Sequence, residues 1–498
     1  MRLLILHALL PDSRQTTIDH VGCYLRHLPG CEIVFHHLRQ PTERLRRLAP
    51  IDGIVLNYCF LGHRQVPQLP EIRARYRDLP SFGPIVALPQ DDYTRYAILD
   101  DWLHELGAAH IFTPLADHRD HLYPQCLATA RFHSALTGYV EEDRLARLAP
   151  TCRPLRERPI DLGTRVRSHA PYVGRYGQRK GALAEALAAR LAGSGLRLDL
   201  STRPEDTLHG ERWFDFLASC RFVVGQNGGA SLADPDGSIR ARVECFVAER
   251  PDASFEEVER ACFPGLDGLH LMTAPSPRLF EAAATRTCQI LVEDDYLDLE
   301  PWRHYLPLRQ DLSNLDEVTA AMHDLGRAQE IADACYDELI ASGRFSYRSF
   351  ARRVVRTLTG RDPRGAAPST CRYSNALELR LQEAPRRLGL TLFDAFRRWL
   401  QRSPRSDQLA GVAEALRAAR SDDWLDGMSP WDLQQLVTWS ASRAAADAAF
   451  LELVSELRRV GGLDACRAWV EAIAGGALGP EQLQPWSEPE LLLGERGT

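Results

Sequence analysis

The feature of this chain that most restricts its fold is an alternation of short apolar runs with longer amphipathic segments, which occurs twice along the sequence. The apolar runs of the first series cover residues 2–7, 31–38, 52–60, 83–90 and 109–115, and those of the second cover residues 160–167, 196–202, 221–226 and 288–293. Short, nearly continuous apolar runs are typical of parallel strands that helices bury on both faces. The alternation therefore predicts an α/β protein with two tandem Rossmann-like, doubly wound domains that face a cleft.

Changes in composition indicate where the domains end. Residues 140–158 are charged and interrupted by prolines, which favours a domain boundary in that stretch. Residues 360–371 have the composition of a linker, and the sequence after them has helical periodicity. We predict domains at residues 1–150 and 151–360, followed by an all-helical region at residues 361–498.

One segment of the helical region is basic and amphipathic. It covers residues 385–405, and its apolar side carries Leu392, Phe393, Phe396, Trp399 and Leu400. Such a helix either contacts a membrane surface or a partner protein, or packs against its neighbours in a helical module. The sequence leaves both interpretations open.

Composition and charge exclude several classes of protein. The chain has 498 residues, of which 45% are hydrophobic and 26% charged, and a net charge of −7, so it gives no overall case for binding nucleic acid. Its 12 cysteines show no C-x-x-C spacing, which favours a reducing compartment. Without a signal-peptide pattern or a run of about 18 apolar residues, the chain is expected to be cytoplasmic, with peripheral contact at the inner face of the membrane as a further option.

Two loops that follow strands have the residues of an anion site. The first, residues 164–181, joins a strand to a helix, and its cations and glycines are Arg165, Arg167, Gly174, Arg175, Gly177, Arg179 and Lys180. A helix N-terminus in such a place favours an anion such as a phosphate. The second loop contains Gly225, Gly228 and Gly229, whose backbone can approach a ligand closely. The alternatives are a solvated basic loop and an ordinary glycine turn.

A third segment, residues 276–295, reads as a helix followed by a strand. Pro277 suits the first helical turn, and Arg278 and Glu281 then share one face of the helix. Glu281 could accept both hydroxyls of a ribose while Arg278 meets a phosphate. By themselves the two side chains are equally consistent with a surface ion pair.

The motifs of the second series resemble a known family. "DLGTRVR…GRYGQRKG", "FLASCRFVVGQNGGASLADPDGSIR" and "SPRLFEAAA" are similar to GT-B glycosyltransferases of the group 1 and spore-coat type, a group of bacterial sugar transferases. The resemblance covers about residues 1–360 and implies an acceptor domain followed by a nucleotide-sugar domain. It implies that Glu281 binds the donor ribose. The position of a second family glutamate holds Thr273, and an insert at residues 232–274 replaces a short loop.

The resemblance also implies the reaction and its partners. The chain is expected to move a sugar from a nucleotide-diphosphate sugar to an acceptor hydroxyl on a glycan, a lipid-linked glycan or a protein. No metal and no cofactor other than the donor substrate are expected, because the cations of the second domain neutralise the leaving diphosphate.

The first domain is expected to supply the catalytic base. Asp91 and Asp92 follow a strand, so one of them is expected to face the cleft, and Asp91 is the preferred base. The alternative is an aspartate that caps the next helix. His20, in the helix after the first strand, is a second candidate, because histidine accepts protons near neutral pH. A structural role for His20 is the alternative.

Two other functions compete with sugar transfer. A sugar-nucleotide epimerase of the same fold would convert the nucleotide sugar without a second substrate. A degenerate transferase would act as a binding protein that recruits a partner through its helical region, and Thr273 is consistent with that alternative.

Overall fold

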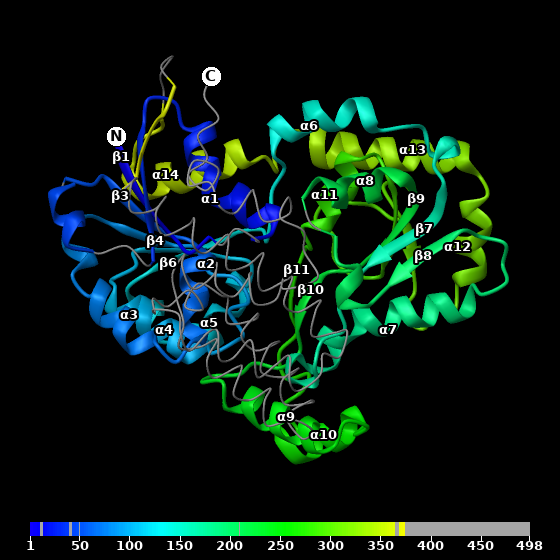
Figure 1. Ribbon diagram of the computed structural model, residues 1–498, viewed down its shortest axis with the longest axis horizontal. Helices are drawn as coiled ribbons and strands as arrows, with labels where there is room; N and C mark the ends of the chain where they lie inside the picture. Colours follow the sequence, from blue (N-terminus) through cyan, green and yellow to red (C-terminus); the bar gives the residue numbers. More distant parts are fainter. Residues whose placement is uncertain (10–12, 39–41, 49, 209, 364–367, 374–498) are drawn as a thin grey trace, which may run out of the picture. The chain divides into compact units, whose positions relative to one another are not determined.

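The first domain is built on a parallel sheet. The computed structural model describes residues 1–9, 13–38, 42–48, 50–208, 210–363 and 368–373. The seven strands of this sheet have the order β14-β2-β1-β3-β4-β5-β6. They are β1 (Arg2–His7), β2 (Glu32–His37), β3 (Gly53–Leu56), β4 (Ile85–Ala87), β5 (His110–Thr113), β6 (Arg131–Ser134) and β14 (Thr370–Tyr373). Strands β1, β3, β4 and β6 are labelled in Figure 1. All pairs from β2 across to β6 are parallel, as the apolar runs predict for β1 to β5, whereas β6 lies outside the predicted runs.

Helices cover both faces of this sheet. They are α1 (Gln15–His27), α2 (Tyr58–Leu61), α3 (Leu69–Tyr76), α4 (Tyr96–Glu105), α5 (Arg119–Leu122) and α14 (Tyr347–Thr359). Ile72 of α3 and Trp102 of α4 pack in one apolar core with Leu4 and Ile54 of the sheet. On the opposite face, α14 contacts α1, β3 and β4. Because successive strand residues point to opposite faces, a strand covered on both sides has to be apolar throughout.

The second domain has the same organisation. Its five strands have the order β13-β12-β9-β7-β8 and are all parallel. They are β7 (Ile160–Arg165), β8 (Leu198–Ser201), β9 (Cys220–Gly225), β12 (Cys288–Val292) and β13 (Leu306–Leu308). The helices are α6 (Glu142–Leu148), α7 (Gly174–Arg190), α8 (Glu211–Ser219), α11 (Arg278–Ala284), α12 (Leu315–Met322) and α13 (Leu325–Tyr336). The prediction of two α/β domains with parallel sheets is confirmed.

In both sheets the first strand of the domain lies inside the sheet. β1 lies between β2 and β3, and β7 lies between β8 and β9. The chain therefore winds outward in both directions from β1 and from β7. At such a reversal the connections leave on opposite sides, and a crevice stays open beyond the carboxyl ends of the two strands. The crevice of the second domain lies at the ends of β7 and β9.

The insert at residues 232–274 forms a small helical unit. It contains α9 (Ser238–Glu249) and α10 (Phe255–Cys262), and it ends in β11 (Met272–Ala274), which pairs with β10 (Gly228–Ala230). Leu232, Ile239, Val243, Val258 and Phe263 form a core of its own. The insert also bonds to the first domain, since the Asp234 amide donates to the Tyr93 carbonyl at 2.8 Å and the Tyr96 amide donates to the Asp234 carbonyl at 3.2 Å.

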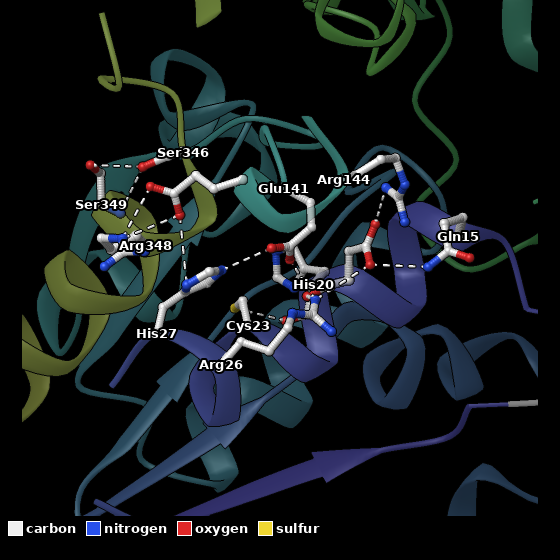
Figure 2. Close-up of polar contacts among 12 residues, drawn as sticks. Gln15, His20, Cys23, Arg26, His27, Glu141, Arg144, Ser346, Arg348 and Ser349 are labelled. Atoms are coloured by element: carbon white, nitrogen blue, oxygen red, sulfur yellow. Dashed lines mark hydrogen bonds and ion pairs between the residues drawn. The ribbon is translucent and has the colours of Figure 1, made fainter. Parts of the chain in front are cut away.

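The chain returns to the first domain after α13. Val140 pairs with Ser346 where the chain crosses between the domains, and the Tyr347 amide donates to the Val140 carbonyl at 2.9 Å. Ion pairs support this crossing from both sides: Arg144 bonds Asp19 of α1 at 2.5 Å, and Arg348 of α14 bonds Glu142 at 3.0 Å (Figure 2). The helix α14 thus belongs by its contacts to the first sheet, although it lies within residues 151–360.

The strand β14 falls in the region expected to be helical after residue 361. The Thr370 amide donates to the Cys31 carbonyl at 2.9 Å, at the edge of the sheet beside β2. An open sheet edge presents unpaired backbone groups, and a passing segment can pair with them whatever its helical propensity. The amphipathic segment at residues 385–405 lies outside the described residues. Within the described ranges, no helix is both long enough and apolar enough to cross a membrane.

Candidate functional site

A pocket opens at the crevice of the second domain. Its walls come from the ends of β7 and β9, from α7 and from the start of α11. Leu183 and Val224 supply apolar wall, whereas Lys180, Gln226 and Arg278 supply polar groups. A mostly apolar pocket with a few converging polar groups is the usual form of a ligand site.

Lys180 lies on α7 and lines this pocket. Its ammonium forms no hydrogen bond or ion pair with any residue that the structure describes. Burial, together with the neighbouring Arg278 cation, lowers the pKa of Lys180 to about 7, while the Asp91 carboxylate acts in the opposite direction. Lys180 is also the only lysine in the sequence, since all the other residues in the count of 60 Lys and Arg are arginines. Such a cation has its hydrogen-bonding capacity available for an anionic ligand.

Arg278 begins α11 on the opposite wall of the pocket. Its Nη2 donates to the Arg165 carbonyl at 2.5 Å, and its guanidinium lies over the Trp213 ring, 5.3 Å from the centroid. Among the residues that the structure describes, its buried Nε has no hydrogen-bond partner. Burial lowers the pKa of Arg278, and the Glu281 carboxylate opposes this effect. Arg278 and Lys180 therefore present two cations to one small space.

Glu281 lies one turn after Arg278 on α11. Its Oε2 accepts a hydrogen bond from Trp213 Nε1 at 2.8 Å. Burial raises the pKa of Glu281, and the Trp213 bond and the Arg278 cation oppose that rise. The carboxylate, the indole and the guanidinium form a single cluster. Glu281 is half-buried, so it is not the exposed partner of a surface ion pair that the sequence left as an alternative.

The other predicted cations have different surroundings. Arg165 bonds Asp199 at 2.6 Å and lies over the Phe216 ring, and Arg175 bonds Glu256 at 2.9 Å and lies over the Phe255 ring. Arg179 lies over the Tyr176 ring, and Arg167 follows the end of β7. The structure therefore brings Lys180 and Arg278 together, whereas Arg165 and Arg175 are occupied by carboxylates of β8 and of the insert.

The two candidate glycines differ in their surroundings. Both belong to β10, and a Cβ added to Gly229 would stand 2.0 Å from the Met272 carbonyl oxygen of β11. Gly229, with a φ of 133°, is therefore required by the close approach of these two strands. A Cβ added to Gly228 would stand 3.6 Å from Lys180 Nζ. That separation is an ordinary van der Waals contact, so the space beside the ammonium does not require a glycine at position 228.

Asp91 approaches the cluster from the first domain. It follows β4 and is exposed, and its Oδ1 accepts a hydrogen bond from the Tyr93 hydroxyl at 3.1 Å. Its carboxylate raises the pKa of both Lys180 and His169 of the second domain. Asp92, the neighbouring candidate, points into the core, where it accepts hydrogen bonds from Thr113 and Tyr123.

Arg14 and His169 belong to the same cluster but were not identified from the sequence. The exposed Arg14 precedes α1, and its charge lowers the pKa of Lys180 and of Arg278. Partial desolvation of the ring, followed by the Lys180 cation, lowers the pKa of His169. One signal for Arg14 was its place after β1, at the crevice of the first sheet.

His20 lies apart from this cluster. It is 2% exposed, its Nδ1 is 2.9 Å from Asn57 Nδ2, and its ring contacts Tyr58, Tyr347 and Phe350. Burial lowers the pKa of His20 to about 3. The helix α14 supplies two of the three rings, so the burial of His20 depends on a segment far along the chain.

The pKa of Lys180 leads to a test of the pocket. An amine with a pKa of about 7 is neutral above that pH, so an acylating reagent is expected to modify Lys180 with a midpoint near pH 7. For an ordinary lysine this midpoint lies at pH ~10.4. Peptide mass spectrometry checks this directly, because the N-terminal amine is the only other primary amine.

Two companion experiments complete the test. Arg278→Ala is expected to raise the midpoint, because it removes the neighbouring cation. Inorganic pyrophosphate is expected to slow modification, because a bound anion favours the protonated amine. A midpoint near that of free lysine would contradict the clustering of charges described above.

Comparison with known proteins gives similarity at the level of the fold. No protein-family model and no curated protein matches the sequence. Among solved structures, an alpha-glucosyltransferase in complex with UDP-glucose and DNA has a TM-score of 0.42 and 9% identity over 72% of this chain and 99% of that chain. HepE from Anabaena in complex with UDP-glucose has a TM-score of 0.39 and 11% identity over 72% of this chain and 100% of that chain. With TM-scores below 0.5, these similarities assign neither an activity nor a ligand to this chain.

Proposed function

We propose that this protein is a glycosyltransferase that moves a sugar from a nucleotide-diphosphate sugar to an acceptor hydroxyl. The observation that carries the proposal is the pocket at the reversal of the second sheet, where Lys180 and Arg278 face one space and Glu281 stands one turn further along α11. Two cations beside one carboxylate match a diphosphate joined to a ribose. Asp91 adds a proton acceptor from the first domain.

Each residue has a separate task in the proposed reaction. Lys180 and Arg278 bind the diphosphate and stabilise the negative charge that grows on it as the bond to the sugar breaks. Glu281 accepts hydrogen bonds from the ribose hydroxyls. These cations supply the positive charge that the leaving group requires, so the proposed mechanism is independent of metal. The donor is a substrate, and the proposal includes no other cofactor.

Asp91 is the proposed general base. The acceptor oxygen attacks the anomeric carbon, the bond from that carbon to the diphosphate oxygen breaks, and the electron pair leaves with the nucleoside diphosphate. The proton of the acceptor hydroxyl passes to the Asp91 carboxylate. Because His20 is buried among aromatic rings, the proposal assigns the proton to Asp91 alone. The proposed acceptor is a glycan, a lipid-linked glycan or a protein.

A screen of nucleotides and nucleotide sugars tests this function. Donors that bind are expected to raise the melting temperature, since a ligand that binds only the folded state stabilises it. The donor that gives the largest shift is then incubated with the protein, with and without candidate acceptors. Nucleoside diphosphate and a glycosylated acceptor, formed together, are the expected products.

The same experiment separates the competing functions. A sugar-nucleotide isomer formed without acceptor would indicate an epimerase. Absence of any nucleotide binding, together with a stable protein complex that depends on residues 361–498, would indicate a degenerate transferase acting as a binding protein.

A further inference from the structure

The loop that carries Asp91 has an unusual backbone. It joins β4 to α4, and both Asp91 and Arg95 adopt left-handed conformations, with φ values of 52° and 50°. Residues with a Cβ are uncommon in this region, and each costs on the order of 1–3 kcal/mol unless the surroundings enforce the conformation. Something in the structure therefore has to hold this loop in place.

Arg64 occupies the interior of the loop. Its side chain is 1% exposed, and its guanidinium donates to the carbonyls of Asp91 at 2.8 Å and of Thr94 at 2.9 Å. Further bonds reach the carbonyls of Gln90 and Leu61, both at 3.2 Å. One planar group thus satisfies three carbonyls of the loop and one of α2. A buried carbonyl without such a donor would be costly.

Asp92 fixes the same loop from the core side. It is fully buried, and its Oδ2 accepts hydrogen bonds from the hydroxyls of Thr113 and Tyr123. Burial raises the pKa of Asp92 and lowers the pKa of Arg64. The charge of each residue opposes this effect by favouring the ionised form of the other. The buried pair leaves the Asp91 side chain to point outward between its two anchors.

We infer that Arg64 is a positioning residue for the reaction, because its buried guanidinium holds the strained backbone of residues 90–94 and thereby fixes the direction of the exposed Asp91 carboxylate. This role rests on the proposed function, in which Asp91 takes the acceptor proton. Arg64 itself touches neither substrate in that scheme. A displacement of about 1 Å at a reacting group can lower the rate by about 10²-fold, so a rigid support for the base has a large effect.

Arg64→Lys is the informative substitution. Lysine keeps the positive charge beside Asp92 but lacks the planar fork that reaches several carbonyls at once. Arg158→Lys is the matched control, since Arg158 is also 1% exposed and its guanidinium also bonds backbone carbonyls, including that of Cys220 at 2.9 Å, but in the second domain. Both substitutions remove buried hydrogen bonds, but only Arg64 supports the Asp91 loop.

The first measurement does not depend on activity. The Asp91 carboxylate raises the pKa of His169, whose other charged neighbours are Lys180, Arg14 and Arg167. The pKa of His169, followed by NMR and assigned with His169→Gln, is expected to fall in Asp91→Asn and to fall similarly in Arg64→Lys. It is expected to stay unchanged in Arg158→Lys. An unchanged value in a folded Arg64→Lys protein would overturn the inference.

The second measurement is a double-mutant cycle on kcat. Arg64→Lys is expected to lower kcat by about 10- to 100-fold with donor affinity retained, and to add little when Asp91→Asn is already present, because residues that act as one unit are not additive. An equal loss in the Asp91→Asn background would show general damage and overturn the inference. If the His169 shift occurs but the wild-type protein transfers no sugar, the positioning role stands and the proposed function fails.

Discussion

Lys180→Ala is expected to lower kcat/KM for the nucleotide-sugar donor by about 10²- to 10³-fold, the loss found when one preorganised charge-stabilising group is removed from an active site. Lys180 makes no hydrogen bond or ion pair within the described part of the chain, so the substitution breaks no internal contact there. The effect is expected mainly in kcat, because the charge on the diphosphate grows as the bond to the sugar breaks. Steady-state kinetics with saturating acceptor measure it.

Two further variants make this result specific. Lys180→Arg keeps the positive charge and is expected to recover part of the activity. Arg190→Ala removes an exposed cation from the last turn of the same helix and is expected to leave kcat/KM within about twofold, since a screened surface charge contributes little. A Lys180→Ala protein with wild-type kinetics would remove Lys180 from the proposed mechanism.

Glu281→Ala is expected to weaken binding of the nucleotide donor by about 10- to 100-fold, because hydrogen bonds to a charged group contribute about 1.5–3 kcal/mol. The chain is expected to stay folded, since the substitution removes a carboxylate whose pKa burial raises. Isothermal titration with the nucleoside diphosphate gives the loss of affinity. Binding of inorganic pyrophosphate is expected to persist, because Lys180 and Arg278 remain.

The pair of ligands separates a ribose contact from general damage to the pocket. If pyrophosphate and the nucleoside diphosphate lose affinity equally, Glu281 acts by shaping the pocket around Trp213 rather than by binding the ribose. Glu281→Gln keeps an oxygen that can accept from Trp213 Nε1 and serves as the control for that hydrogen bond. Unchanged donor affinity and turnover in Glu281→Ala would refute the ribose assignment.

Much of the fold was predictable from short windows of sequence. The apolar runs of the two series became strands of the two parallel sheets, because a strand covered on both faces must be apolar along its whole length. The insert at residues 232–274 could be recognised from the sequence, because it interrupts the alternation of strands and helices. Its hydrogen bonds to Tyr93 and Tyr96 could not be predicted. The strand β14 was missed because pairing with an open sheet edge depends on the edge and not on the segment.

The site was only partly predictable for a related reason. Arg278 and Glu281 could be paired from the sequence because they lie one turn apart on one helix. Arg165 and Arg175 looked equivalent to Lys180 in the sequence, yet Asp199 and Glu256 bond the first two and leave the third without such a partner. The ribose, phosphate and base assignments themselves stay predictions until the experiments above are done.

Hydrophobic periodicity acts over a few neighbouring residues, so the sequence alone predicts the two α/β domains, their parallel sheets and the loops at each crevice. Which charged side chains are available to a ligand follows from the three-dimensional packing. It lets the Asp91 carboxylate of one domain raise the pKa of Lys180 of the other, and it covers His20 with Tyr347 and Phe350 of α14. The physical reason is that the availability and pKa of a charged group depend on burial and on partners that are close in space but remote in sequence.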